Sequence, residues 1–244
     1  MGKQGDGGDA ETKSDVERNF EAIARAIAYA AREQGPDPDD NLWLRCAMER
    51  AERANMEEHL IEQARARGAG ETDDPPLEEV TFEGYGPGDV AVFVRSITES
   101  TRLTREELDE IFKQHGGNIG EDGCVAWQFD RRGLVLVDAA SVDDEDAFTL
   151  AIIERGGDEL GDPLYSEDED RPTVYRVYCE GERLLDLAGA LDEDGYRVRD
   201  LRWIRQPTQR VELSSDQARN FLAFNEKLSK RVDVQDVFSN WTTT

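Results

Sequence analysis

Residues 83–129, EGYGPGDVAVFVRSITESTRLTREELDEIFKQHGGNIGEDGCVAWQF, decide the fold predicted for this chain. The stretch contains two glycine-rich corners, at 84–88 and 116–120, between patterns typical of strands and of a helix. Glycine supplies positive φ and Pro87 fixes φ, so the first corner predicts a tight turn. Apolar, β-branched and aromatic runs of strand length lie on both sides of it, which predicts a hairpin.

A helix and a third strand are expected after the hairpin. Thr104 and Glu107 have the T-x-x-E spacing of a capping box, so the helix should begin at Thr104. The paired glycines of the second corner favour a left-handed helix end. Alternating apolar residues then predict a strand over 124–129. The central block therefore reads strand, strand, helix, strand.

The same two corners resemble the signature of a known family. The motif at 83–88, followed by those at 116–120 and 122–126, is similar to that of the YebC/PmpR family of transcriptional regulatory proteins, which includes a mitochondrial translational activator. The likeness extends from about Phe20 to Phe238. It implies a three-domain arrangement, DNA binding and transcriptional control, and no active site.

Three helices are expected before the central block. Residues 1–13 are polar and predicted to be disordered. A capping box at Ser14 predicts the first helix, and the second should begin near Pro38 with Asp37 as its cap. With a third helix over 57–67, these elements predict a helical domain covering residues 14–70.

The patterns after the central block follow the order βαββαβ, which is typical of a ferredoxin-like unit, over residues 133–205. A helix at Ser214 and a strand at 234–238 cannot bury themselves alone. We therefore expect residues 206–240 to return to the central block at 77–132, with the ferredoxin-like unit inserted between. The predicted class is α+β, with an N-terminal three-helix domain and two ferredoxin-like α/β domains, one inserted into the other.

Charge is the most pronounced feature of the composition. Of 244 residues, 55 are acidic and 29 basic, which gives a net charge of −26, and the basic residues comprise 24 Arg but only 5 Lys. So much acid disfavours nucleic acid as a partner at low salt. The acidic residues occur in every segment, and we hypothesise a halophilic host. At about 1 M salt the Debye length is only ~3 Å, so long-range repulsion is largely screened.

The sequence lacks the residues that several classes of function require. The cysteines Cys46, Cys124 and Cys179 are far apart and predict free thiols, and two histidines, His59 and His115, predict no transition-metal site. Without a G-x-S-x-G motif, P-loop or Rossmann fingerprint, we expect no enzyme, no cofactor and no small-molecule substrate. No apolar run approaches the ~18 residues of a membrane span, and no signal peptide is apparent, so a cytoplasmic protein is expected.

One segment stands apart from the acidic background. Residues 197–231 contain nine cations and four acids, a net charge of +5, which leaves −31 for the remainder. Arg202 and Arg205 lie beside Trp203, so a basic surface with an aromatic ring is available to phosphates. Alternatively, these arginines pair with neighbouring carboxylates.

Other candidate residues lie on the corners and on the third helix. Tyr85 and Asn118 are not required by tight turns, and on exposed loops they would stack on a base or bond to a phosphate. Arg65 and Arg67 match the basic helix end of the family, although the N-terminal segment is acidic here and basic in family members. The predicted nucleic-acid-binding residues are Arg65, Arg67, Tyr85, Asn118, Arg202 and Arg205.

The sequence thus predicts a DNA-binding transcriptional regulator. A second hypothesis is a ribosome-associated translation factor that relieves stalling, because three domains of different shape can span an RNA surface and recognition by shape tolerates a weaker charge effect. A third is a protein-binding adaptor, which the acidic surface would suit. The expected partner is nucleic acid, either DNA or ribosomal RNA, with no membrane.

Overall fold

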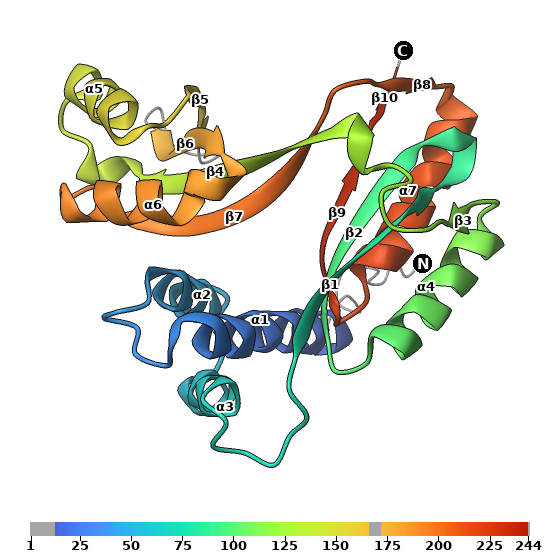
Figure 1. Cartoon of the computed structure of the whole chain (residues 1–244), viewed down its shortest axis with the longest axis horizontal. Coiled ribbons are helices and arrows are strands. Elements are labelled where there is room, and N and C mark those ends of the chain that lie inside the picture. The colour runs from blue at the N-terminus through green and yellow to red at the C-terminus, as the bar shows by residue number, and fades with distance from the viewer. Residues whose placement is uncertain (1–12, 166–171, 244) are drawn as a thin grey trace, which may run out of the picture.

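The computed structural model describes residues 13–165 and 172–243, so residues 1–12 of the predicted disordered tail lie outside it. The chain forms three parts: a group of N-terminal helices and two antiparallel sheets, each with its own helices (Figure 1). The N-terminal helices lie below both sheets in that view and touch each of them. The predicted α+β class is confirmed. Within the described ranges, no helix has the length and apolar character needed to cross a membrane.

The N-terminal helices are α1 (Lys13–Gln34), α2 (Leu42–Arg53) and α3 (Glu58–Gly68). The prediction that the second helix begins near Pro38 was wrong, because the cap is Asn41. Its fully buried side chain accepts a hydrogen bond from the Leu44 amide (2.9 Å) and donates to the Ala30 and Gly35 carbonyls. Those extra bonds place Asn41, rather than Asp37, at the helix start.

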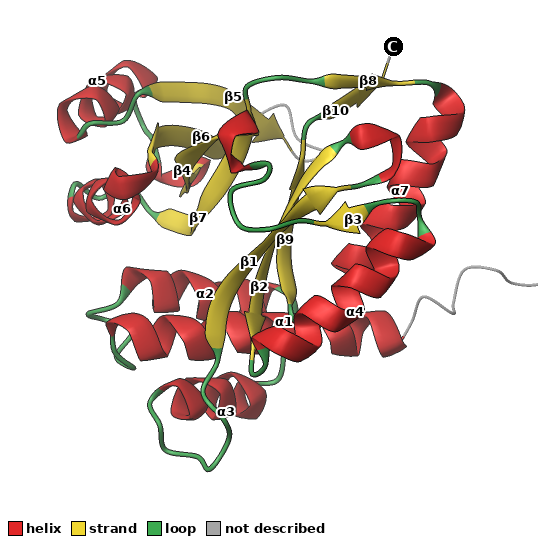
Figure 2. Cartoon of the chain, turned by 45° about the vertical axis from the view of Figure 1, so that its right-hand side comes forward, coloured by secondary structure: helices red, strands yellow, loops and turns green. Residues whose placement is uncertain are grey.

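The central sheet has the strand order β3-β1-β2-β9, all antiparallel. The predicted hairpin is confirmed, and α4 and α7 cover one face of the sheet (Figure 2), where Phe112 and Phe224 meet edge to face at 4.8 Å. The last helix and strand do return here after the insertion, as expected. The elements are β1 (Glu78–Tyr85), β2 (Ala91–Thr98), α4 (Thr101–Gln114), β3 (Asn118–Ile119), α7 (Ser215–Ser229) and β9 (Val234–Ser239).

Two local predictions in this block were wrong. Helix α4 begins at Thr101, capped by Ser100, because the Thr104 hydroxyl is buried and donates to Asp233 at 2.7 Å. Residues 124–128 form a turn and a short 3₁₀ helix, Ala126–Gln128, and of the predicted strand 124–129 only Phe129 lies in a strand, as the first residue of Phe129–Asp138. The cause is Glu83, whose buried carboxylate accepts hydrogen bonds from three amides of this turn, those of Gly123, Val125 and Ala126 (2.8–2.9 Å).

The inserted unit has the strand order β5-β6-β4-β7, and its βαββαβ path confirms the predicted ferredoxin-like topology. Strands β4 and β7 pair as far as Phe129 and Pro207, so this two-stranded ribbon runs past the expected limits at 133 and 205 into the central part (Figure 1). The elements are β4 (Phe129–Asp138), α5 (Glu145–Arg155), β5 (Glu159–Tyr165), β6 (Pro172–Glu180), α6 (Leu184–Glu193) and β7 (Val198–Pro207).

The remaining elements are short. Strands β8 (Val211–Leu213) and β10 (Trp241–Thr243) pair in parallel beyond the central sheet. The three parts of the chain meet where α2 packs on β7, and there the rings of Trp43 and Trp203 lie edge to face at 5.3 Å. This meeting point positions the site described next.

Candidate nucleic-acid interface

Two neighbouring cavities lie where the three parts meet. The outer pocket, of about 290 Å³, is lined by Phe93, Arg95, Trp203 and other residues of β1, β2, β4, β7 and β9. The inner cavity, of about 80 Å³, is lined by residues of α1, α2, β2, β7 and β9, and it shares Arg95 and Trp203 with the outer pocket. Together they contain five arginines against three carboxylates: Arg50, Arg95, Arg131, Arg202 and Arg205 against Glu79, Asp200 and Asp236.

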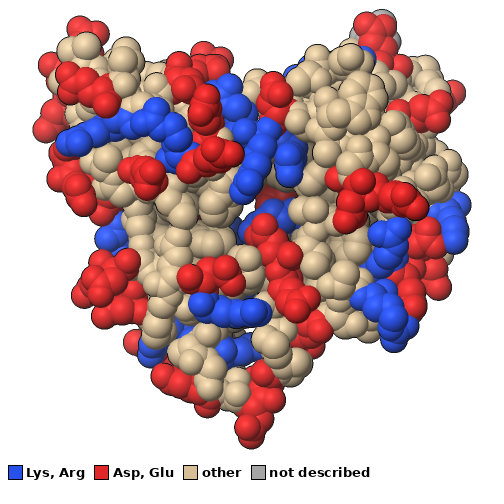
Figure 3. Space-filling view, in the orientation of Figure 1, with Lys and Arg blue, Asp and Glu red and all other residues tan. Residues whose placement is uncertain are grey.

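This arrangement concentrates positive charge on a protein that is otherwise strongly acidic. Figure 3 shows a group of Lys and Arg side chains at the hollow between the parts, with Asp and Glu side chains also beside it and in many places on the remaining face. Low-dielectric walls around a cluster of one sign strengthen its field at the mouth of a cleft. The excess of arginines over carboxylates in the two cavities would therefore favour an anion there.

Arg131 and Arg205 form the core of the outer pocket. They lie directly opposite each other on β4 and β7, and neither has an ion pair with a carboxylate among residues 13–165 and 172–243. Like charges at such positions are destabilising. Burial lowers the pKa of Arg205 below its usual value, and the charge of Arg131 lowers it further.

Aromatic rings hold these two guanidinium groups. The Arg205 Cζ lies 4.3 Å from the ring centroid of Phe93, so this side chain reaches from the inserted unit to the central sheet. The Arg131 Cζ lies 5.7 Å from the ring centroid of Trp203, whose indole nitrogen donates to the Gly181 carbonyl. Both cations are thus oriented by a ring face and keep their hydrogen-bond donors for another group.

Arg95, in contrast, is fully engaged. It donates to Glu79 at 2.7 Å and to Asp236 at 2.9 Å, which joins strands β1, β2 and β9. Burial has the largest single effect on its pKa and lowers it, but the two carboxylates together raise the pKa above the usual value. Because its side chain lines both cavities, Arg95 lies between them.

The other two arginines of the inner cavity have fewer hydrogen-bond partners than Arg95. Arg202 pairs with the buried carboxylate of Asp200, but its Nε has no hydrogen-bond partner. The guanidinium of Arg50, on α2, has neither an ion pair nor a hydrogen bond in the described part of the chain, and its Nε is buried. Burial lowers the pKa of Arg50, the largest effect, while Asp200 opposes the shift.

Tyr85 and Asn118 are brought together, but away from this hollow. They face each other in the register of β1 and β3. Tyr85 is half-buried, and its hydroxyl accepts a hydrogen bond from Gln128 at 3.2 Å, while Asn118 is exposed. Of this pair, only the Asn118 side chain is fully available to a ligand.

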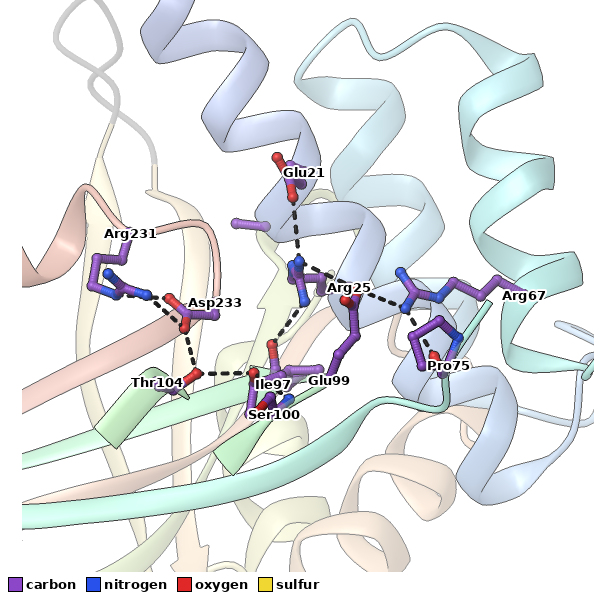
Figure 4. Close-up of polar contacts among 12 residues, drawn as sticks. Glu21, Arg25, Arg67, Pro75, Ile97, Glu99, Ser100, Thr104, Arg231 and Asp233 are labelled. Carbon is purple, nitrogen blue, oxygen red and sulfur yellow. Dashed lines mark hydrogen bonds and ion pairs between the residues drawn. The ribbon is translucent and has the colours of Figure 1, made fainter. Parts of the chain in front are cut away.

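Arg65 and Arg67 lie on α3, and both have carboxylate partners. Arg65 donates to Glu62 at 2.8 Å. Arg67 donates to Glu99 at 2.7 Å and to the Pro75 carbonyl, and Figure 4 shows it pointing toward the central sheet beside Arg25. These contacts tie α3 to the loop that follows it and to the sheet.

The basic segment 197–231 is largely neutralised, as the alternative reading of that segment anticipated. Six of its nine cations pair with carboxylates: Arg197, Arg199, Arg202, Arg219, Lys230 and Arg231. Arg205, Arg210 and Lys227 have no ion pair in the described ranges. Of these three, Arg205 lines the outer pocket.

Sequence reasoning missed Arg131 and Arg50. Arg131 lies 74 positions before Arg205, and only the β4–β7 register brings them together. Arg50 lies among charged residues on α2, where nothing in the local pattern distinguishes it from a solvated helix face. Pairing the first and last predicted strands of the inserted unit was the one available signal for Arg131.

Cys46, Cys124 and Cys179 are free thiols, as predicted. Among the described residues, no group of His, Cys, Asp and Glu is arranged to hold a metal ion.

Known relatives match nearly the whole chain. The family model for the TACO1/YebC second and third domain matches residues 77–241, and that for the TACO1/YebC N-terminal domain matches residues 10–71. A probable transcriptional regulatory protein of Synechococcus sp. (strain JA-2-3B'a(2-13)) is 41% identical over 225 residues, covering 91% of this chain and 86% of the relative. A protein of the same name from Dictyoglomus turgidum is 36% identical over 222 residues, covering 91% and 86%.

A solved structure shares the fold. The crystal structure of a conserved hypothetical protein from Aquifex aeolicus is similar to this chain with a TM-score of 0.75 at 32% sequence identity. The match covers 96% of this chain and 94% of that chain.

Proposed function

This chain belongs to the YebC/PmpR family, and on that premise we propose that it regulates gene expression by binding nucleic acid at the outer pocket. The observation that carries the proposal is the pair Arg131 and Arg205, two opposed cations without carboxylate partners in the described ranges. A phosphate placed between them would relieve their repulsion and accept charge-assisted hydrogen bonds. The adjoining rings of Phe93 and Trp203 orient both cations.

The size of the pocket favours unpaired RNA over duplex DNA. A volume of about 290 Å³ accommodates a group of nucleotide size and excludes a double helix. An unpaired nucleotide can offer its base and its phosphate at once, whereas the bases of a duplex are stacked inside. Single-stranded loops and bulges are abundant in ribosomal RNA, so we favour a ribosome-associated translation factor.

DNA-binding transcriptional regulation is the second candidate, and the names of the curated relatives favour it. In this chain, Arg65 and Arg67 on α3 would contact DNA phosphates, with Asn118 and Tyr85 on the glycine corners. Both arginines would first have to leave Glu62 and Glu99. That exchange weakens the contribution of α3 to duplex binding relative to that of the outer pocket.

Salt decides whether either nucleic acid is bound tightly. A net charge of −26 repels phosphates at low ionic strength, and this repulsion is largely screened at about 1 M salt. Local contacts at the outer pocket survive screening better than long-range attraction, because they are partly desolvated. Binding should therefore be examined in concentrated salt.

One experiment distinguishes the three candidate functions by identifying the molecules that the protein binds in a host lysate. Tagged protein would be sedimented from a host lysate in molar salt, with and without ribonuclease, and the bound nucleic acid sequenced. Co-migration with ribosomes that ribonuclease abolishes supports the translation factor, and recovery of discrete promoter DNA supports the transcriptional regulator. Recovery of proteins alone supports the adaptor and contradicts nucleic-acid binding.

A matched pair of variants assigns the site in the same experiment. The double variant Arg131→Gln/Arg205→Gln removes two cations from the outer pocket. The control Arg102→Gln/Arg219→Gln removes two exposed cations, each paired within its own helix, and changes the net charge equally. Loss of co-migration only in the first variant supports the outer pocket, and equal loss in both contradicts it.

A further inference from the structure

The inner cavity carries an inference separate from nucleic-acid binding. We propose that it binds one small tetrahedral oxyanion, phosphate in particular, between Arg50 of α2 and Arg202 of β7. The cavity lies behind Arg95, where residues from all three parts of the chain converge. Such an ion would contact the N-terminal helices and the inserted unit at once.

Unsatisfied donors are the first observation behind this site. The Nε atoms of Arg50 and Arg202 are both buried and lack a hydrogen-bond partner, and both residues line the same cavity. Buried donors that are left unpaired cost free energy, and a guanidinium offers five N–H groups in a fixed fork. A tetrahedral oxyanion has enough oxygen atoms to accept hydrogen bonds from two guanidinium groups at once, whereas a single carbonyl oxygen does not.

The distribution of carboxylates is the second observation. Asp200 and Asp236 line the cavity, but Asp200 is engaged by Arg202 and Asp236 by Arg95. Of the three arginines that line this cavity, Arg50 is thus the one without an ion pair among the described residues. Burial makes this lack more costly, because water does not solvate the charge fully.

The small volume and the enclosing walls of the inner cavity restrict it to a small ligand. The volume of about 80 Å³ exceeds the ~10–15 Å³ that one water molecule needs, and the edge-to-face rings of Trp43 and Trp203 form part of the wall. A nucleobase does not fit such a space, but a phosphate group does. Because the ion would contact α2 and β7 together, its binding would stabilise the packing of the N-terminal helices on the inserted unit.

Two sources can supply the same chemistry. One is free inorganic phosphate, and the other is a backbone phosphate of a nucleic acid that reaches past Arg95 from the outer pocket. Both present a tetrahedral oxyanion to Arg50 and Arg202. The experiment below distinguishes them by competition.

The test begins with the unmodified full-length protein. Equilibrium dialysis against labelled inorganic phosphate, in a fixed background of concentrated KCl, should show saturable binding of about one ion per chain. Absence of saturable binding would overturn the site. Because no variant is needed, this measurement does not depend on whether a substituted chain folds.

Variants then locate the ion. Arg50→Gln should weaken phosphate binding by at least about tenfold, the factor expected when charge-assisted hydrogen bonds are lost. Arg50→Lys should restore part of the affinity, since it keeps the charge but lacks the fork. The control Arg102→Gln, on an exposed helix face, should bind as the unmodified chain does. Equal affinity of Arg50→Gln and Arg102→Gln would overturn the assignment.

Competition identifies the source. If saturating single-stranded RNA displaces the labelled phosphate, a backbone phosphate occupies the site in the complex. If RNA and phosphate bind together, the ligand is the free ion. Either result supports an oxyanion site at Arg50 and Arg202, and only displacement connects it to the outer pocket.

Discussion

Arg131 and Arg205 lie directly opposite each other on β4 and β7, and neither has a carboxylate partner in the described part of the chain. Five of the six other arginines in the basic segment 197–231 pair with carboxylates, whereas Arg205 and the opposed Arg131 do not. Opposed like charges are a cost to the free protein. An anionic ligand converts that cost into binding free energy.

Removing Arg131 and Arg205 should lower the affinity for RNA and make that affinity less dependent on salt. For Arg131→Gln/Arg205→Gln, the slope of log affinity against log salt should become shallower by about 0.7 for each lost phosphate contact to a single strand. Fluorescence anisotropy with a labelled single-stranded RNA measures this slope. An unchanged slope, or the same change in the control Arg102→Gln/Arg219→Gln, would contradict the outer pocket as the binding site.

Glu83 should be essential for the turn that leads into β4. Its carboxylate accepts hydrogen bonds from the amides of Gly123, Val125 and Ala126, and it is only 6% exposed. Glu83→Gln replaces one acceptor oxygen by an NH₂ group that faces amide donors, so the free energy of unfolding should fall by about 1.5–3 kcal/mol. Denaturant unfolding measures this, with Glu78→Gln on the exposed start of β1 as control.

Thr104 should contribute to stability from inside the fold. Its hydroxyl donates to the buried carboxylate of Asp233 (Figure 4) and shares a second hydrogen bond, of 2.9 Å, with the Thr98 hydroxyl. Thr104→Val keeps the shape but leaves both partners with one bond fewer, at a cost of about 1–3 kcal/mol. Thr101→Val, on the exposed first turn of α4, should change the free energy of unfolding far less. Equal effects of the two substitutions would show that the buried bond is not stabilising.

The buried thiols should resist alkylation. Burial raises the pKa of Cys46 to about 12 and that of Cys179 to about 11, and Asp200 and Asp158, respectively, add to these shifts. At about pH 8, iodoacetamide should therefore modify Cys124, which is partly exposed, before the other two. Peptide mass spectrometry follows each site. Rapid native modification of Cys46 would contradict its packing against the inserted unit.

The same shifts set a pH dependence. Both thiols keep their protons in the folded chain above pH 9, where unfolded thiols ionise. Their contribution to stability is therefore complete below about pH 9 and is lost as the pH rises toward 11–12. Thermal unfolding between these pH values should show stability falling, and less steeply in Cys46→Ser.

Concentrated salt should stabilise the protein if the halophilic hypothesis is correct. Acidic side chains repel one another across the surface, and the Debye length falls from ~10 Å at 0.1 M to ~3 Å at 1 M salt. The melting temperature should rise steadily with KCl over this range and beyond. Full stability in low salt would refute the hypothesis and leave the charge of −26 without a role in solvation.

The sequence was most informative where one face of an element is buried. The hairpin at Pro87, the βαββαβ path and the return of the last helix to the central sheet follow from periodicity and from the need to bury apolar faces. The errors arose where a distant side chain satisfies the backbone. Asn41 fixes the start of α2, and Glu83 prevents a strand at 124–129, and neither bond is visible in a local pattern.

Only some residues of the candidate site could be chosen from the sequence, for a similar reason. Arg205 was chosen because it lies in a basic segment beside Trp203, and the structure places it in the outer pocket. Arg131 and Arg50 depend on strand register and on the packing of α2 against β7, which composition does not encode. Pairing with Glu99 likewise arises only from tertiary contact, so the engagement of Arg67 was not foreseen.

Ultraviolet crosslinking tests the central claim most directly. Full-length protein would be irradiated with single-stranded RNA in concentrated salt, and the modified peptides identified by mass spectrometry. We expect adducts on peptides that carry Trp203 or Phe93, whose rings lie beside Arg131 and Arg205. Adducts confined to α3 and the glycine corners, or no adducts at all, would contradict RNA binding at the outer pocket.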